Sequence, residues 1–213
     1  MGSEREVYEV NLSYPNVKNM ADVQRLVKER VSHAQKGEWI SGSGWDEGKL
    51  AEKRYIYAKD LDDISPDNPV VLAHTMGHYL VANSSALRAA GISRDTPDPP
   101  GGTIDRGPDG EPTGVLKERA NQLVGKLIPA YTAQQMHDAV AKTAQRASSE
   151  CLTGIKDPGI QQEQWDNYQL LRKGRQASAA RRGAVAHAWR SRPGEEPHRE
   201  DQAHQPPRCA DHR

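Results

Sequence analysis

The sequence predicts an α/β fold built around a parallel sheet, on three observations. The segment Pro69 to Ala73 is a short, unbroken apolar run, as expected for a strand that is buried on both faces of a sheet. From Tyr79 to Ala90 the apolar residues recur at helical spacing, and Gly91 suits the left-handed conformation that commonly ends a helix. Further along the chain, helical and strand-like segments alternate, which is typical of right-handed crossovers between parallel strands.

The first part of the chain predicts a strand, a helix and a second strand. Val7 to Leu12 alternates apolar and polar residues, as a short strand would. A helix follows, with Asn19 as its cap, Asp22 in its first turn and Gly37 at its end. Trp39 to Glu47 then predicts a strand that runs into a glycine-rich bend. These glycines lack the spacing of a phosphate-binding loop, so we expect no nucleotide site there.

The segments on either side of the central unit predict short connectors and further helices. Lys59 to Ser65 predicts a short helix that leads into the central strand. Asp109-Gly110 is a strong hairpin signal between two strand-like segments. Val115 to Leu127 has apolar residues at helical spacing, and Thr132 with Gln135 predicts the capping box of a long helix.

Two histidines follow the central strand, at the end where α/β folds place their ligands. His74 and His78 are therefore candidates for a ligand pocket, and the alternative is that both only satisfy backbone groups of a loop. Their spacing matches that of the HExxH zinc proteases, but Thr75 stands in place of the glutamate and Gly77 disfavours a helix between them. We therefore do not expect a zinc site of that type.

A second candidate pocket residue is Asp157. It ends a predicted short strand, Ile155 to Gly159, before a helix that begins at Gln161 and runs to Leu171. An aspartate in this position also commonly caps a turn through its own side chain, and that alternative stays open.

The composition limits the core and the kinds of partner. Only 35% of the 213 residues are hydrophobic and Phe is absent, so one domain with a modest core is expected. The 29 basic and 29 acidic residues form no basic stripe, which argues against nucleic acid as a partner. No apolar run approaches the roughly 18 residues of a membrane span, and the first residues lack the apolar core of a signal peptide. We expect a cytoplasmic protein with no membrane partner.

The end of the chain differs in composition from the rest. From Gln176 to Arg213 Arg, Ala, Pro and His dominate, so the segment cannot bury enough apolar surface to offset its ordering entropy. We predict a folded domain over residues 1–171 and a disordered tail over residues 172–213. The abrupt change after Leu171 is also typical of GC-rich codons read out of frame, so a frameshift is a hypothesis, with an anion-binding tail as the alternative.

Five motifs occur in an order that resembles a known family. They are GSGWDEG, DLDDISPDNPVVLAHTMGHYLVANSSALRAAGI, PDPPGGTIDRGPDGEPTGVLKE, IPAYT and GIKDPGI, which begin at Gly42, Asp60, Pro97, Ile128 and Gly154. Together they resemble the amidohydrolase family 3 branch of the metal-dependent hydrolases, which includes N-substituted formamide deformylases. The resemblance covers residues from Val7 to Leu171.

The resemblance implies a (β/α)8 barrel, and because the family-like segment is shorter than the roughly 250 residues of a closed barrel, we expect an incomplete one. It also implies hydrolysis of non-peptide carbon–nitrogen bonds and zinc or a similar divalent cofactor. The superfamily holds its metal with an HxH pair and with later histidine and aspartate residues. No HxH occurs in this sequence, so no metal ligand can be assigned.

Four residues match positions within the family motifs and are predicted to face the substrate pocket, namely His74, His78, Asn83 and Asp157. The sequence therefore predicts a fragment of a metal-dependent amidohydrolase for small amide-type substrates, inactive as this chain alone. The alternative is a non-enzymatic module that binds a small molecule or a protein through the face around His74 and His78.

Overall fold

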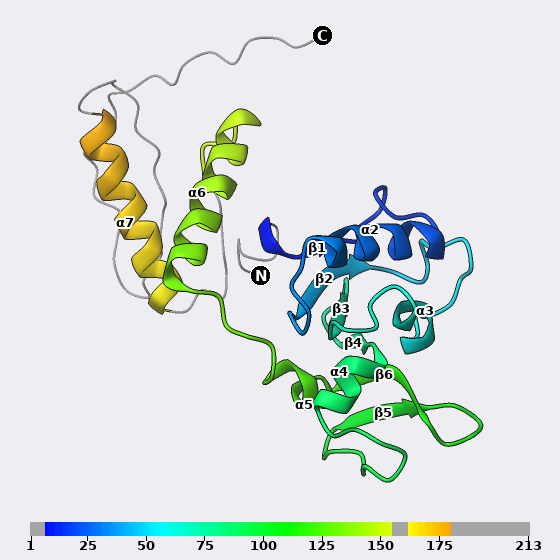
Figure 1. The fold of residues 1–213 in the computed structure, drawn as a ribbon. Helices are drawn as coiled ribbons and strands as arrows, with labels where there is room; N and C mark the ends of the chain where they lie inside the picture. Colours follow the sequence, from blue (N-terminus) through cyan, green and yellow to red (C-terminus); the bar gives the residue numbers. More distant parts are fainter. Residues whose placement is uncertain (1–6, 155–161, 180–213) are drawn as a thin grey trace. The chain divides into compact units, whose positions relative to one another are not determined.

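The computed structural model describes residues 7–154 and 162–179 of the chain (Figure 1). It divides into two compact units, the first ending at Tyr131 and the second beginning at Thr132. The predictions for Asp157, for the strand that contains it and for the tail beyond Ala179 lie outside the described residues.

A six-stranded mixed sheet forms the centre of the first unit. Its strands lie in the order β1-β2-β3-β4-β6-β5. The first three pair in parallel and the last three pair antiparallel, so the described strands form an open sheet with β1 and β5 at its edges. The α/β class is confirmed, while no closed barrel is formed by the residues described. The strands are β1 (Val10–Asn11), β2 (Ile40–Trp45), β3 (Val70–His74), β4 (Tyr79–Ala82), β5 (Gly102–Arg106) and β6 (Pro112–Glu118).

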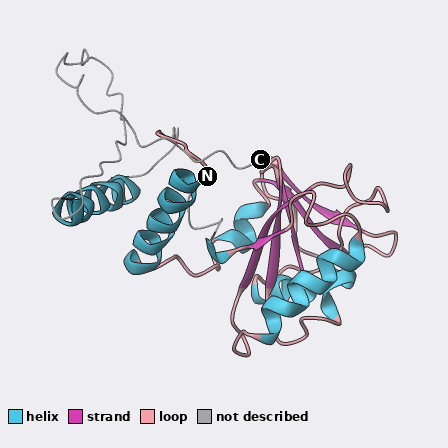
Figure 2. Ribbon diagram, turned by 90° about the horizontal axis from the view of Figure 1, so that it is seen from above, coloured by secondary structure: helices cyan, strands magenta, loops and turns pink. Residues whose placement is uncertain are grey.

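Helices cover both faces of this sheet (Figure 2). Side chains of α2 (Met20–Ser32) and α3 (Ala58–Asp62) share one core with Val70 and Leu72 of the central strand. Side chains of α4 (Ser84–Ala89) and α5 (Asn121–Gly125) share the other core with Val71. Successive residues of a strand point to opposite faces, so the apolar run of β3 feeds both cores, as predicted for a strand buried on both sides.

Helix α2 begins where the sequence predicts. The Asn19 side chain accepts a hydrogen bond from the Asp22 N–H at 2.9 Å, and the Glu52 carboxylate accepts the Met20 N–H at 3.0 Å. Two of the N–H groups that a helix leaves without a partner inside it are thus satisfied. The helix ends at Ser32, so Gly37 does not terminate it but lies in the following turn, at φ 82°.

Two segments that were predicted to be helical are strands. Tyr79 to Ala82 forms β4, because Gly77 turns the chain at φ 74° and brings this segment back alongside β3. Helix α4 begins only after Asn83, which caps it. Strand β6 occupies the start of the segment Val115 to Leu127, and only the short helix α5 follows within it. In both segments, pairing with neighbouring strands overrides a helical spacing of apolar residues.

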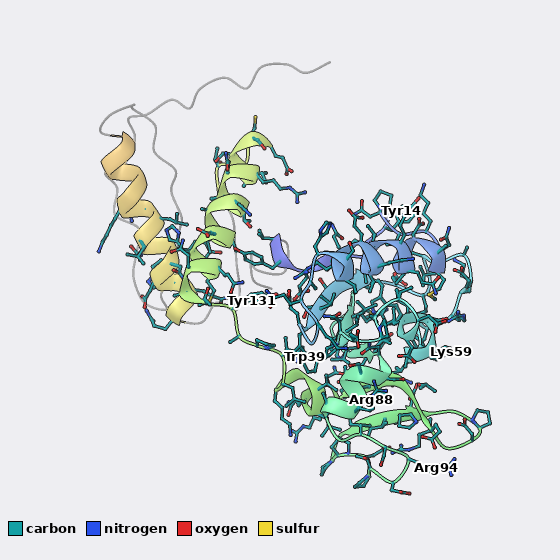
Figure 3. All side chains as sticks on the ribbon, in the orientation of Figure 1. Tyr14, Trp39, Lys59, Arg88, Arg94 and Tyr131 are labelled. Carbon is teal, nitrogen blue, oxygen red and sulfur yellow. The ribbon has the colours of Figure 1, made fainter. Side chains whose placement is uncertain are left out.

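The hairpin predicted at Asp109-Gly110 is confirmed. It joins β5 to β6, with the Gly107 N–H donating to the Glu111 carbonyl at 2.8 Å and Gly110 at φ 83°. Arg94, labelled in Figure 3, lies beside this hairpin, where its guanidinium forms an ion pair with Glu111 at 3.1 Å. This ion pair links the chain segment that follows α4 to the loop of the hairpin.

The second unit contains two helices that pack on each other, α6 (Ala133–Ser149) and α7 (Gln162–Ala179). The predicted capping box of α6 is confirmed: Thr132 Oγ1 accepts the Gln135 N–H at 3.2 Å, and Gln135 Oε1 accepts the Thr132 N–H at 2.8 Å. The helix predicted to begin at Gln161 is also confirmed, and it continues through the change of composition after Leu171. Among residues 7–154 and 162–179, no helix is both long and apolar enough to cross a membrane.

Candidate functional site

A polar cluster lies where β2 and β3 end at the same edge of the sheet. Asp46 and Glu47 directly follow β2, and His74 is the last residue of β3. The two strands are parallel, and a bulge between Ser43 and Trp45 aligns Trp45 with His74. One imidazole and two carboxylates thereby come within 4.8 Å of one another at a position where α/β folds place ligands.

The hydrogen bonds of His74 determine which ring nitrogen carries the proton. The side chain is only 3% exposed, and its Nε2 lies 2.9 Å from Glu47 Oε2. On the other side of the ring, the Met76 N–H donates to Nδ1 at 3.2 Å. A nitrogen that accepts a hydrogen bond carries no proton, so the neutral imidazole has its proton on Nε2 and donates it to Glu47.

Aromatic rings hold the imidazole in place. The ring of Tyr79 stacks on His74 with 4.2 Å between centroids, and the indole of Trp45 meets it edge-on at 4.7 Å. The indole N–H is in turn bonded to the Leu72 carbonyl at 3.0 Å, and Trp45 is fully buried. These contacts fix the plane of the imidazole, because both flanking rings are themselves held by the sheet.

The charges around the cluster are unevenly placed. Burial raises the pKa of Tyr79 to about 12, helped by a hydrogen bond with Tyr55 and by the negative charge of Glu47, so Tyr79 is a neutral phenol at physiological pH. The hydrogen bond with Asp105, at 2.8 Å, raises the pKa of Lys117, whose ammonium lies 5.4 Å above the Tyr55 ring. Because this ammonium is already paired with Asp105, it does not neutralise Asp46 and Glu47, and this edge of the sheet stays acidic.

Asp46, Glu47 and His74 are, by donor type, the described residues that could hold a divalent metal, since zinc accepts imidazole and carboxylate ligands. Their hydrogen bonds do not fit one. A metal needs the lone pair of a ring nitrogen, but Nε2, which faces the carboxylates, carries the proton, and the lone pair of Nδ1 accepts from the Met76 backbone. In this arrangement the imidazole is a hydrogen-bond donor to the Glu47 carboxylate.

His78, the second predicted histidine, lies apart from this cluster in its contacts. Its side chain is 59% exposed, and its Nδ1 lies 3.1 Å from Glu118 Oε1. Glu118 has φ 51°, and its N–H donates to the His78 carbonyl at 2.7 Å. This is a solvent-exposed contact between the residue before β4 and the last residue of β6. A contact of His78 with substrate stays a prediction.

Asn83 is fully buried and all of its hydrogen-bonding groups are engaged within the protein. Its Oδ1 accepts from the N–H groups of Val70 and Ala86 at 3.0 and 2.9 Å. Its Nδ2 donates to Ser65 and to the Asn68 carbonyl. Asn83 therefore joins β3, α4 and the loop before β3. Its predicted contact with substrate is not tested by this geometry, and Asp157 lies outside the described residues.

The sequence interpretation missed Asp46 and Glu47, although the signal was present. They directly follow a strand that was itself predicted, and the rule that singled out His74, a polar residue at the carboxyl end of a strand, applies to them equally. The pairing of β2 with β3 was needed to place them beside His74.

Comparisons with known proteins show the family of this chain. The model of the amidohydrolase family matches residues 3–202. YtcJ of Bacillus subtilis, which is named as an amidohydrolase, is 38% identical over 132 residues, covering 62% of this chain and 25% of YtcJ. The N-substituted formamide deformylase of Arthrobacter pascens is 33% identical over 115 residues, covering 54% of this chain and 21% of the deformylase.

A solved structure shares the fold. An uncharacterized metal-dependent hydrolase from Pyrococcus horikoshii OT3 superposes with a TM-score of 0.50 at 20% sequence identity, over 82% of this chain and 32% of that protein. This chain spans a quarter or less of the length of the two curated relatives. The family match nevertheless includes almost every residue, the cluster at the ends of β2 and β3 among them, and it runs past Leu171. The chain belongs to the amidohydrolase family.

Proposed function

We propose that this chain is part of a metal-dependent amidohydrolase that hydrolyses non-peptide carbon–nitrogen bonds of small amide-type substrates. The family match over residues 3–202 is the observation that carries the proposal. The name of the Arthrobacter pascens relative, an N-substituted formamide deformylase, supports the amide-type bond and a small substrate.

Hydrolysis of such a bond needs a water nucleophile, a polarised carbonyl and a proton for the departing amine. The described residues supply part of a binding surface for these steps. Glu47 is 32% exposed and keeps one carboxylate oxygen for a donor, so it is suited to accept an amide N–H of the substrate. We assign no metal-activated water to these residues, because neither ring nitrogen of His74 has a lone pair available for a metal.

We further propose that the chain is inactive by itself. It has no HxH pair anywhere in its sequence, and it matches a quarter or less of each curated relative. In this proposal the remaining strands and ligands come from the rest of a complete family member. The domain boundary at Leu171 and the frameshift stay predictions, which sequencing of the locus with all three reading frames translated will test.

The test uses two proteins: this chain, and a complete open reading frame reconstructed from the same locus. Both are assayed for amine release from N-methylformamide, with and without added zinc, and Glu47→Gln in the complete protein serves as the matched site variant. We expect metal-dependent turnover by the complete protein, a raised KM in the variant and no turnover by this chain. A complete protein that fails on amides with and without metal would overturn the proposed function, and turnover by this chain would overturn its inactivity.

A second candidate function is a binding module without catalysis. It is favoured by one observation, the His74–Glu47 hydrogen bond, in which a protein donor orders a partly exposed carboxylate. Shifts of the NMR signals of Glu47 and Tyr79 on addition of N-methylformamide, in a complete protein that does not turn it over, would support this alternative. Unchanged spectra would exclude it for this ligand.

A further inference from the structure

The cluster of Asp46, Glu47 and His74 offers the donor types of a zinc site, yet the hydrogen bonds of the imidazole run in the opposite sense to ligation. We infer that His74 is a positioning residue that donates its Nε2 proton to Glu47, and that this cluster does not hold the divalent metal of the family. The inference assigns a role to each nitrogen of one ring, and it does not depend on turnover by the chain.

The orientation of the imidazole is fixed by two partners on opposite sides. The Met76 N–H points at Nδ1 from 3.2 Å, and Glu47 Oε2 lies 2.9 Å from Nε2. Turning the ring by half a revolution would set carbon atoms in front of both partners and lose both hydrogen bonds. The stacked ring of Tyr79 and the edge-on ring of Trp45 leave the imidazole plane itself unchanged. One orientation therefore satisfies all four neighbours.

Ligation by Nε2 would require its proton to leave. The proton cannot move to Nδ1 while the Met76 N–H occupies that nitrogen, so binding a metal would leave a backbone N–H without its acceptor beside a buried ring. Metal-binding histidines in proteins normally show the reverse pattern, with the second nitrogen donating to a carbonyl or carboxylate. Here the second nitrogen accepts.

The carboxylate side of the pair fits a positioning role. The His74 side chain is 3% exposed, whereas that of Glu47 is 32% exposed. A buried donor that holds one oxygen of a half-exposed carboxylate restricts its rotamers and leaves the other oxygen towards solvent. Within the described parts of the chain, no group donates to that second oxygen, so its direction is set by His74 alone among the side chains around it.

The first experiment measures which nitrogen carries the proton. Long-range 1H–15N spectra of the 15N-labelled protein should show the Nε2–H form of His74, with a slowly exchanging proton that exchanges faster in Glu47→Ala. Addition of zinc should leave these signals in place. An Nδ1–H form, or loss of the Nε2 proton on adding zinc, would overturn the inference.

The second experiment compares metal content in variants that keep the fold. His74→Gln retains a donor close to the position of Nε2 but offers no nitrogen lone pair, and His33→Gln removes an exposed histidine as the matched control. After dialysis against zinc, the wild type, His74→Gln and His33→Gln should hold the same amount of metal. The loss of one equivalent in His74→Gln, but not in His33→Gln, would show that His74 is a ligand.

The two experiments also separate this inference from the proposed function. Neither readout requires substrate, so an inactive complete protein would leave the tautomer and zinc results unaffected. Conversely, zinc bound through His74 would overturn the positioning role while leaving amide hydrolysis by the family member in place.

Discussion

Replacement of Asn83 by alanine tests the most connected side chain of the first unit. Asn83 caps α4 by accepting the Ala86 N–H, and with the same oxygen it accepts the Val70 N–H of β3. Its amide nitrogen bonds to the loop before β3, at Ser65 and Asn68. The variant therefore removes a cap and several cross-connections at once, in a place where water cannot replace them because Asn83 is fully buried.

The expected cost follows from these contacts. Loss of the cap costs about 1 kcal/mol, and leaving the buried Val70 N–H and the loop acceptors at Ser65 and Asn68 without this partner adds roughly 3 kcal/mol. Asn19→Ala is the matched control, since Asn19 caps α2 with one hydrogen bond to a partly exposed helix end and should cost only about 1 kcal/mol. The difference between the two variants, about 3 kcal/mol, isolates the bonds that Asn83 makes beyond its cap.

Urea unfolding of both variants, followed by far-ultraviolet circular dichroism, gives the comparison directly. Thermal midpoints should fall by roughly 10 °C for Asn83→Ala and by about 3 °C for Asn19→Ala. If the free energies of unfolding of the two variants differ by less than about 1 kcal/mol, the structural role given to Asn83 is wrong.

Three further predictions concern packing and charge. Gly114→Ala should destabilise the protein by roughly 3 kcal/mol, because at φ 98° the new Cβ would lie 2.5 Å from a backbone oxygen of β4. The control Gly37→Ala has open space around the new Cβ at φ 82° and should cost about 1 kcal/mol. Equal urea midpoints for the two variants would contradict this prediction. Leu72→Ala should cost about 3 kcal/mol, since Leu72 is fully buried, and a loss below about 1 kcal/mol would show that the site collapses around the change. Burial raises the pKa of Asp60, but hydrogen bonds from Arg54 and from a backbone N–H outweigh it and hold that pKa below its ordinary value. The stability that the lowered pKa supplies is present above the ordinary carboxyl pKa of about 4 and is lost as the pH falls below it. The free energy of unfolding should therefore fall less steeply from pH 5 to 3 in Asp60→Asn than in the wild type. Parallel pH profiles of the two proteins, measured by circular dichroism, would refute this prediction.

The sequence predicts well where a local signal suffices. The cap at Asn19, the capping box at Thr132 and the hairpin at Gly110 each depend on residues a few positions apart, and the structure confirms all three. The resemblance of ordered motifs to a family is confirmed as well, because it relies on many residues at once.

Local signals fail where a distant strand decides the conformation. Leu80 and Val81 fit a helical spacing, but in the structure they feed opposite faces of the sheet, because β4 pairs with β3 and β6. The candidate site shows the same limit. His74 and Glu47 each stand at the end of a predicted strand, but the two become partners only once β2 and β3 are known to be neighbours.

The extra residue in β2 has a consequence for any change in the length of this strand. Ile40 faces the core beneath α2, and an unbroken alternation would send Trp45 to the opposite face. The bulge at Gly44, where φ is 96°, reverses the alternation and returns the indole to the same core as Ile40. Without Gly44 the strand would need no bulge, because Trp45 would stand four residues after Ile40 and face the same core. The bulge therefore lets β2 carry one more residue without turning Trp45 away from the imidazole that it supports.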